Sequence, residues 1–335
     1  MRRALVTGAT GLVGSYIVER LLADGWSVRS LVRSPSPELR TLGVELVTGD
    51  VLDAASFANA AAGCEVVFHT AAAVIAAGGW DTYRRLNVDG TWNAIAAAER
   101  AGARLLHLSS VAVYSSRYED PSKKTHEDAP MGPLPERAFY GRSKRESELM
   151  VLQAHATGRI WATAVRPCVI YGRRDRHFVP RMANLLGRGF APLIGGGRST
   201  MALVHAANVA DGAVLAATSD VAGGRAYNLA NDFDVTVREC FLLGAEGLGK
   251  RVRLVPVPLF AARAAFAVLY HGLRLLSGGR ASFLTRESLA MITRDNPYDS
   301  SRARRELGWT PRVHHVDGIP DAFRWWRDSQ LHSRQ

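Results

Sequence analysis

Residues 7–14 read Thr7-Gly8-Ala9-Thr10-Gly11-Leu12-Val13-Gly14, a glycine-rich segment that indicates the fold of the chain. It follows a short apolar run, Arg3-Ala4-Leu5-Val6, which is typical of a buried strand, and it precedes helical spacing over 12–22. Glycines at this place let the backbone turn sharply and approach a pyrophosphate closely. The N–H groups at the start of the following helix attract phosphates. The stretch therefore predicts a strand, turn and helix that bind a dinucleotide.

Strands and helices continue to alternate along the chain. The sequence predicts strands over 27–32, 44–47, 65–68, 104–108 and 161–166, and helices over 54–62, 86–101 and 140–155. Alternation at this spacing indicates βαβ units and an α/β fold with a doubly wound parallel sheet. We expect residues 1–170 to form a dinucleotide-binding domain to which residues 200–230 return. Residues 171–335 should form a smaller, mostly helical lobe for the substrate.

The composition and the cysteines exclude several classes of protein. With 47% hydrophobic and 22% charged residues, the 335-residue chain has an ordinary globular composition. Cys64, Cys168 and Cys240 are widely spaced, which argues against a zinc site or a disulfide framework. We expect no metal site. The first strand begins so close to Met1 that no room is left for a signal peptide, so a cytoplasmic location is expected.

The formal net charge of +11 is carried mostly by arginine. No basic run interleaved with aromatic residues occurs, so nucleic acid is not an expected partner, whereas an acidic ligand such as a phosphorylated cofactor fits the charge. The most apolar stretch, 254–277, is interrupted by prolines and basic residues, so no integral membrane segment is expected. It predicts a packed helix of the substrate lobe. The alternative is a surface helix that contacts a membrane through 259–277.

The second predicted strand ends with Leu31-Val32-Arg33-Ser34. An acidic residue there would hydrogen-bond a ribose 2′-hydroxyl and favour NAD, whereas Arg33 suits a 2′-phosphate. This favours NADP(H) over NAD(H). Asp50 and Val51 follow the third strand, where we expect contact with the adenine edge; capping of the next helix is a second role for Asp50.

Tyr140 and Lys144 lie four residues apart in a predicted helix and therefore share one face. A cation beside a phenol lowers its pKa from about 10, so that it exchanges a proton near neutral pH. Only four of the 42 basic residues are lysines, so a lysine here is unlike the arginine-rich background. Such a pair alone is common. Its position after a dinucleotide turn makes it a candidate catalytic pair.

Taken together, the motifs resemble those of the extended short-chain dehydrogenases/reductases over nearly the whole chain. In order they are Thr7-Gly8-x-x-Gly11-x-x-Gly14, Asp50, His69-Thr70-Ala71-Ala72, Asn87-Val88-x-Gly90-Thr91, Ser109-Ser110-x-x-Val113-Tyr114, Tyr140-x-x-x-Lys144 and Arg166-Pro167-x-x-x-Tyr171-Gly172. Residues 299–311 resemble the family's C-terminal signature. The segment over 203–210, with Asn208 where sugar-nucleotide epimerases and dehydratases more often carry Asp, resembles the 3β-hydroxysteroid dehydrogenase/isomerase branch. The strand over 28–33 resembles that of the dihydroflavonol-4-reductase-like branch. The resemblance implies a Rossmann fold.

The resemblance also implies a catalytic role for four residues. Tyr140 exchanges a proton with the substrate oxygen, Ser110 donates a hydrogen bond to it, Lys144 lowers the pKa of Tyr140 and binds the nicotinamide ribose, and Asn87 holds a water that relays protons to Lys144. The implied cofactor-binding residues are Gly8, Thr10, Gly11, Leu12, Val13, Gly14, Arg33, Asp50, Val51, Thr70, Ala71, Ala72, Tyr140, Lys144, Pro167 and Val169.

The leading hypothesis is an NADP(H)-dependent oxidoreductase that interconverts a ketone and a secondary alcohol on an apolar or polycyclic small molecule. A nucleotide-sugar epimerase or dehydratase with bound NAD is the alternative, and Arg173, Arg174, Arg176 and Arg181 would then contact the diphosphate. A non-catalytic NADP-sensing protein is a third hypothesis, disfavoured because such relatives typically lack the catalytic Tyr and Lys. The resemblance implies a homodimer through the helices over 86–101 and 140–155.

Overall fold

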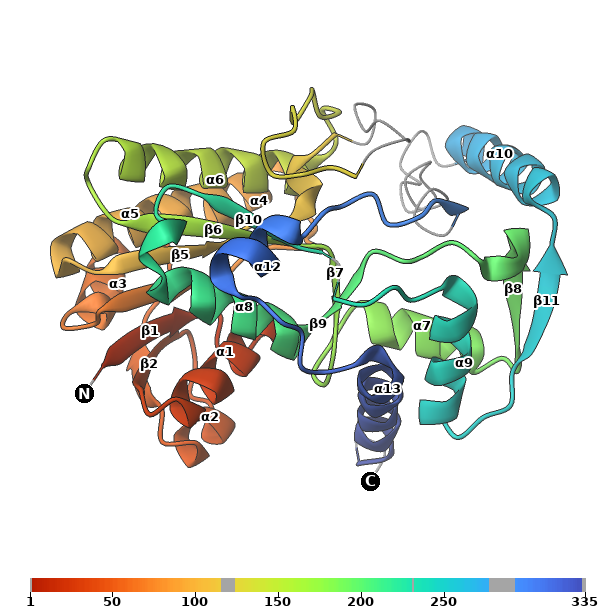
Figure 1. Ribbon diagram of the computed structural model, residues 1–335, viewed down its shortest axis with the longest axis horizontal. Helices are drawn as coiled ribbons and strands as arrows, with labels where there is room; N and C mark the ends of the chain where they lie inside the picture. The colour runs from red at the N-terminus through yellow and green to blue at the C-terminus, as the bar shows by residue number, and fades with distance from the viewer. Residues whose placement is uncertain (1, 116–123, 231, 277–292, 333–335) are drawn as a thin grey trace.

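The computed structural model describes residues 2–115, 124–230, 232–276 and 293–332, with the backbone alone over 269–276. Its centre is a seven-stranded sheet in which every pair of neighbours is parallel (Figure 1). The strand order is β10 (Ala226–Leu229), β6 (Ala162–Pro167), β5 (Arg104–Leu108), β4 (Val66–His69), β1 (Arg3–Thr7), β2 (Ser27–Val32) and β3 (Glu45–Thr48). The order reverses between β1 and β4, where sheets of this kind bind ligands beyond the strands' carboxyl ends. The expected Rossmann α/β fold is confirmed.

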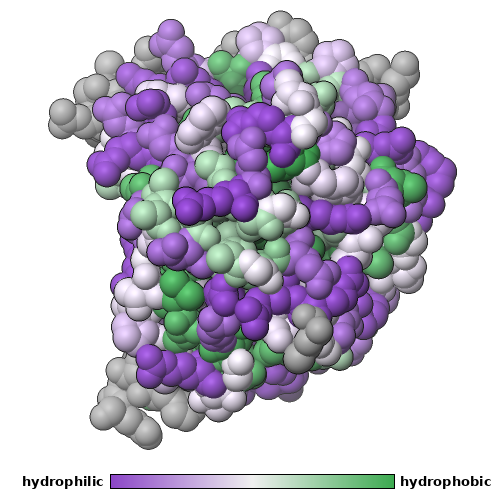
Figure 2. All heavy atoms as spheres, turned by 90° about the vertical axis from the view of Figure 1, so that its left-hand side faces the viewer, coloured by the Kyte–Doolittle hydropathy of each residue, from purple (hydrophilic) through white to green (hydrophobic). Residues whose placement is uncertain are grey.

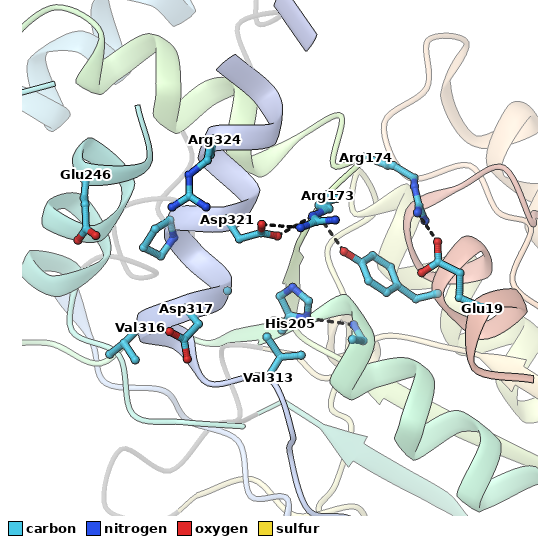
Figure 3. Close-up of a pocket in the computed structure, with 14 residues that line it drawn as sticks. Glu19, Arg173, Arg174, His205, Glu246, Val313, Val316, Asp317, Asp321 and Arg324 are labelled. Carbon is cyan, nitrogen blue, oxygen red and sulfur yellow. Dashed lines mark hydrogen bonds and ion pairs between the residues drawn. The ribbon is translucent and has the colours of Figure 1, made fainter. Parts of the chain in front are cut away.

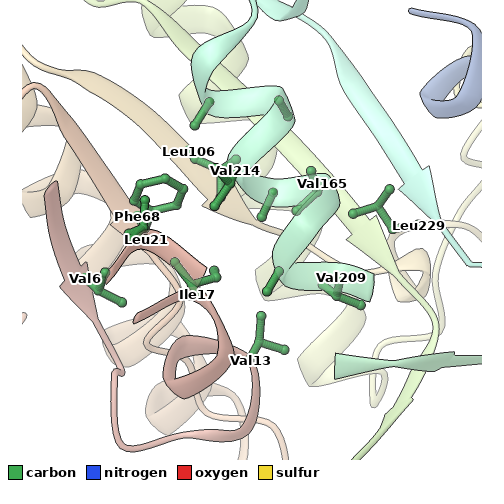
Figure 4. Close-up of a cluster of buried hydrophobic side chains, with 14 of the residues drawn as sticks. Val6, Val13, Ile17, Leu21, Phe68, Leu106, Val165, Val209, Val214 and Leu229 are labelled. Atoms are coloured by element: carbon green, nitrogen blue, oxygen red, sulfur yellow. The ribbon is translucent and has the colours of Figure 1, made fainter. Parts of the chain in front are cut away.

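Helices cover both faces of the sheet. Helices α1 (Leu12–Ala23) and α8 (Ala206–Thr218) pack on one face, and α3 (Ala54–Ala61), α5 (Gly90–Ala101) and α6 (Phe139–Ala156) pack on the other. Successive strand residues point to opposite faces, so both faces of these strands are apolar. Figure 4 shows Val6, Phe68 and Leu106 of the strands packed against residues of α1 and α8. These two layers hold the strand ends of the candidate site in place.

One element differs from the helix predicted over 86–101. Its first turns form a π-helix, η1 (Arg84–Asp89), which follows α4 (Gly79–Tyr83) and leads into α5. Single π-helical turns inside α-helices are frequent at functional sites. Asn87 lies in this π-helix, buried against the loop that follows β4.

The remaining elements form a separate core around Tyr171, Phe241 and Phe323. The lobe contains α7 (Phe178–Leu186), α9 (Val237–Gly247), α10 (Leu259–Leu276) and α13 (His315–His332). It also contains two small parallel pairs, β7 (Val169–Tyr171) with β9 (Leu203–His205) and β8 (Phe190–Ile194) with β11 (Arg253–Val257). The β8–β11 pair was not predicted. Helix α12 (Ser301–Leu307) packs instead against β10 and α8, beside the buried Trp309.

Arginine guanidinium groups stack on tryptophan rings at the end of the main sheet where its strands begin. Arg2 lies 4.3 Å from the Trp26 ring centre and Arg104 lies 4.5 Å from that of Trp161. Figure 2 shows this end of the molecule as a mixture of hydrophilic and hydrophobic residues. These arginines cover apolar rings on the side of the sheet away from the strands' carboxyl ends.

Candidate active site

The glycine turn brings the start of α1 against the end of β1. Gly8 has φ +69°, a conformation that favours glycine, and the N–H of Gly11 donates to its carbonyl oxygen over 2.8 Å. A Cβ on Gly14 would overlap the Gly8 carbonyl group, so no larger residue fits there without a shift. Gly11 is the N-cap residue of α1 and has no side chain to occupy the N–H groups of the first turn. This cradle of backbone suits the pyrophosphate of a dinucleotide.

The loop after β4 is tied to this turn. Thr70 donates from its hydroxyl to the carbonyl oxygen of Thr7 over 2.6 Å, which holds Thr70 and Ala71 against Gly8. The side chain of Asn87 clamps the loop further on: its Oδ1 accepts from the N–H of Ala73 over 2.7 Å, and its Nδ2 donates to the Ala73 carbonyl oxygen over 3.0 Å. Nδ2 also donates to Ser143 Oγ over 2.9 Å. The amide of Asn87 thus joins the loop to α6.

The other predicted cofactor residues lie at or beyond strand ends. Arg33 is exposed directly after β2, and Asp50 follows β3 with its Oδ1 accepting from the N–H of Leu52 over 2.9 Å. Val51 is fixed by Asn93 Nδ2, which donates to the Val51 carbonyl oxygen over 2.9 Å. Pro167 ends β6 and Val169 begins β7. Thr10, Leu12, Val13 and Ala72 lie in the two loops and the first turn described above.

Ser110 and Tyr140 meet beyond the end of β5. The Ser110 side chain is hydrogen-bonded to the Tyr140 phenol. Its Oγ also accepts from the N–H of Ala112 over 3.1 Å, which caps the 3₁₀ turn η2 (Val111–Val113). Gly141 allows this approach, because a Cβ there would lie only 2.5 Å from the Ala112 carbonyl oxygen. The close packing of α6 on η2 therefore places the phenol beside the serine.

The expected lowering of the Tyr140 pKa is wrong for this structure. Burial raises the pKa of the Tyr140 phenol above 10.0, the hydrogen bond from Ser110 opposes that rise, and Tyr83 adds to it. Lys144 is not among the causes of that shift, because with a pKa of about 7 it has lost its charge before Tyr140 titrates; its Nζ lies 3.3 Å from Nε2 of His107. Tyr140 is therefore protonated at neutral pH, the state needed to donate a proton.

Lys144 is the most unusual charge in the site, since only 2% of it is exposed. Burial lowers the pKa of Lys144 to about 7, although the Glu148 carboxylate acts in the opposite direction. Burial followed by the charge of Lys144 lowers the pKa of His107 well below its usual value, so the imidazole is neutral and accepts from the ammonium. Lys144 is thus poised to change charge near neutral pH.

Three residues of this site were missed by the sequence analysis. Tyr83 packs edge-on to Tyr140 at 6.5 Å between ring centres, and its hydroxyl donates to the Val74 carbonyl oxygen over 3.2 Å. His107 contacts Lys144, and Gly141 permits the contact of α6 with η2. A histidine inside the apolar strand at 104–108 was a usable signal for a buried polar role.

A separate pocket of about 540 Å³ lies between α1, the start of α8 and α13 (Figure 3). Tyr140, Lys144 and Ser110 do not line it. Two ion pairs line it: Arg173 donates to both Asp321 carboxylate oxygens over 2.7 Å, and Arg174 pairs with Glu19. Two of the arginines that the epimerase alternative assigned to a diphosphate are therefore neutralised by carboxylates.

Comparison with known proteins identifies the family. The model of the NAD dependent epimerase/dehydratase family matches residues 4–230. The chain belongs to this family. It is 34% identical to a 4-hydroxy-2-methyl-3-oxo-4-farnesyl-3,4-dihydroquinoline-1-oxide ketoreductase of Stigmatella aurantiaca, over 96% of each chain. It is 28% identical to a 3 beta-hydroxysteroid dehydrogenase/Delta 5-->4-isomerase of Mycobacterium tuberculosis, over 92% of this chain and 86% of the relative.

A solved relative has the same fold. DesIV, a dTDP-glucose 4,6-dehydratase of Streptomyces venezuelae solved as a double mutant with NAD bound, is 25% identical and has a TM-score of 0.72. The match covers 99% of this chain and 98% of that one. The resemblance to the extended short-chain dehydrogenases/reductases is confirmed, and the chain is an NAD(P)-dependent dehydrogenase or reductase.

Two further findings concern the described residues only. No helix among them is long and apolar enough to cross a membrane. No group of three or more histidine, cysteine or acidic side chains within the described ranges is arranged to hold a metal ion.

Proposed function

We propose that this chain is an NADP(H)-dependent ketoreductase that interconverts a ketone and a secondary alcohol on an apolar small molecule. The observation that carries the proposal is the Ser110–Tyr140 hydrogen bond beyond β5, with Lys144 one helical turn away. The ketoreductase from Stigmatella supports the reaction and, through the farnesyl group in its substrate's name, an apolar substrate.

The bound cofactor would supply the hydride that reaches the carbonyl carbon. Negative charge develops on the ketone oxygen in that step, and a donor aimed at it stabilises the transition state. Tyr140, held neutral by burial, donates its proton to that oxygen, and the C=O bond becomes C–OH. Ser110 donates a second hydrogen bond to the same oxygen. In the oxidation direction Tyr140 accepts the proton instead.

Lys144 would offset the negative charge that Tyr140 acquires when it gives up its proton. Its ammonium stabilises the phenolate that Tyr140 leaves behind, and it would also bind the nicotinamide ribose. Asn87 would hold a water that relays protons to Lys144. The Asn87 amide positions the loop after β4 through Ala73.

The mechanism is tested with variants at neighbouring serines and at the tyrosine. Tyr140→Phe should lower turnover of a ketone by at least about 100-fold while the Kd for NADPH stays nearly unchanged. Ser110→Ala should lower turnover about 100-fold by removing one donor. Ser109→Ala is the matched control, because Ser109 is buried at the same strand end and its hydroxyl has no partner among the described residues. Retained activity in Tyr140→Phe rules out the mechanism.

The preference for NADP(H) rests on Arg33. This exposed guanidinium at the end of β2 suits a 2′-phosphate by charge and by bidentate geometry. Arg33→Asp should raise the Kd for NADPH by about tenfold or more and lower the ratio of NADPH to NADH affinity. Arg40→Asp, a change of equal charge on the exposed surface of α2 (Pro37–Thr41), should leave the ratio unchanged. An equal preference for NADH in the unaltered protein would contradict the proposal.

One observation supports the epimerase or dehydratase alternative: DesIV, the similar protein solved with NAD bound, is a dTDP-glucose 4,6-dehydratase. Measuring the cofactor that co-purifies decides between the two: tightly held NAD favours the alternative.

We also propose a homodimer through α5 and α6, which expose Trp92 and Leu149 at 54% and 51%. Sedimentation velocity of the protein and of Leu149→Glu tests it, since a dimer at this face should dissociate in the variant.

A further inference from the structure

Helix α10 carries an apolar stripe on its outer face. Phe260 and Val268 are 77% and 73% exposed, more than any other large apolar side chain in the described part of the chain. Ala264 and Ala267 are exposed between them, and the spacing i, i+4, i+7, i+8 places all four on one side of the helix. Figure 1 shows α10 at the rim of the molecule beyond β8 and β11.

The opposite face of α10 accounts for the packing of the helix. Ala262 is buried, and Leu259 and Phe266 are half-buried, again at helical spacing. A helix that only filled a core would expose polar residues on its other side. Here the outward face is apolar as well: Arg263 is the one charged residue over 259–268, and Arg274 follows three turns further along the helix.

The surroundings of α10 are strongly basic. Segments 187–198 and 247–268, which contain β8, β11 and the start of α10, hold six basic residues and no acidic one. All six are exposed, and none forms an ion pair with a described residue. They are Arg188, Arg198, Lys250, Arg251, Arg253 and Arg263. Elsewhere many arginines pair with carboxylates, so this basic region is distinct.

We propose that α10 and the β8–β11 pair dock peripherally on the anionic surface of a lipid bilayer. Phe260 and Val268 enter the headgroup boundary, and the basic residues contact anionic headgroups. A second copy of the chain is a poor occupant, because two such faces would bring unpaired positive charges together. The docking is independent of the proposed function. Only its use, which is to collect an apolar ketone from the bilayer, rests on that function.

Vesicle flotation of the full chain tests the docking. The protein should float with vesicles of equal parts phosphatidylcholine and phosphatidylglycerol, float weakly with phosphatidylcholine alone, and be released by salt. The double variant Phe260→Glu, Val268→Glu should partition at least about tenfold less. The matched control Leu42→Glu, Val221→Glu changes two exposed apolar side chains elsewhere and adds the same charge, so it should lose clearly less.

A second variant keeps the test independent of folding at α10. Arg251→Gln, Arg253→Gln should weaken binding to the anionic vesicles and leave the weak binding to phosphatidylcholine unchanged. Failure to float at low salt, or equal losses in the α10 variant and its control, overturns the proposal. So does a shift in sedimentation of the α10 variant to a smaller species, which would make this face a contact between copies. Loss of ketone reduction with flotation intact would count against the proposed function alone.

Discussion

The chemistry of Lys144 is set by neighbours on two elements. Burial between α6 and the sheet lowers its pKa to about 7, and Glu148, one turn along α6, acts against that shift. His107 on β5 accepts from Nζ over 3.3 Å. An ammonium has only donors, so the imidazole nitrogen that faces it must be unprotonated. The site is thus a buried amine with one neutral acceptor, His107, and one carboxylate, Glu148, one turn along the same helix.

This arrangement predicts the pH profile of ketone reduction. Tyr140 stays protonated through the neutral range because its pKa is raised, so the first group to titrate is Lys144. Its positive charge stabilises the phenolate formed in the transition state. The value of kcat/KM for reduction should therefore fall as pH rises through about 7.

His107→Leu provides the contrast. Removing the acceptor disfavours the ammonium, so the pKa of Lys144 falls further and the inflection of kcat/KM moves to lower pH. His107→Gln, which keeps an acceptor, should restore the inflection toward that of the unaltered protein. Rates measured between pH 5 and 9 check both variants. An inflection that does not move in His107→Leu contradicts this role for His107.

At the scale of elements, the predicted strands and helices correspond closely to the observed ones where glycine stops and apolar runs bounded them. Helix α6 was predicted over 140–155 and spans Phe139–Ala156. The π-helix at Arg84–Asp89 was not foreseen, because its apolar spacing over so few residues differs little from that of an α-helix. The β8–β11 pair joins strands far apart in the chain, a contact that local patterns do not encode.

In the site, too, local motifs predict which residues are present, whereas packing between distant segments sets their environment. Gly8, Ser110, Tyr140 and Lys144 follow from motifs in the sequence, and the structure brings Ser110 and Tyr140 together. The direction of the Tyr140 pKa shift did not follow, because burial depends on how α6 packs against its neighbours.

Gly141→Ala tests that packing. The added Cβ would lie 2.5 Å from the Ala112 carbonyl oxygen, so α6 and η2 must separate and the Ser110–Tyr140 hydrogen bond must weaken. We expect a loss of about 1–3 kcal/mol in the free energy of unfolding and a clear fall in turnover. Gly90→Ala is the control, since a Cβ on this helical glycine makes only an ordinary contact with Val51. Equal stability and activity of the two variants would show that the close approach is unimportant.

Across the whole molecule, histidines buried without charge link stability to acid. His69 on β4 is 1% exposed, its Nδ1 lies 3.0 Å from Thr7 Oγ1, and its ring stacks with that of His107. Burial, followed by the charge of Lys144, lowers the pKa of His69 from 6.5 to about 3. The unfolded chain therefore binds a proton below pH 6.5 that the folded protein does not. The contribution of His69 to stability is fully present above that pH and is lost as pH falls toward 3.

The contribution of His69 is measurable by substitution. Between pH 7 and pH 5 the shift corresponds to about 2 kcal/mol of lost unfolding free energy. His69→Asn removes the titrating group and keeps a polar partner for Thr7, so its urea-unfolding free energy should drop by about 2 kcal/mol less over that interval. His177→Asn, at an exposed position, should show the full acid sensitivity of the unaltered protein. If His69→Asn loses as much stability in acid as His177→Asn, His69 is not a source of the acid sensitivity.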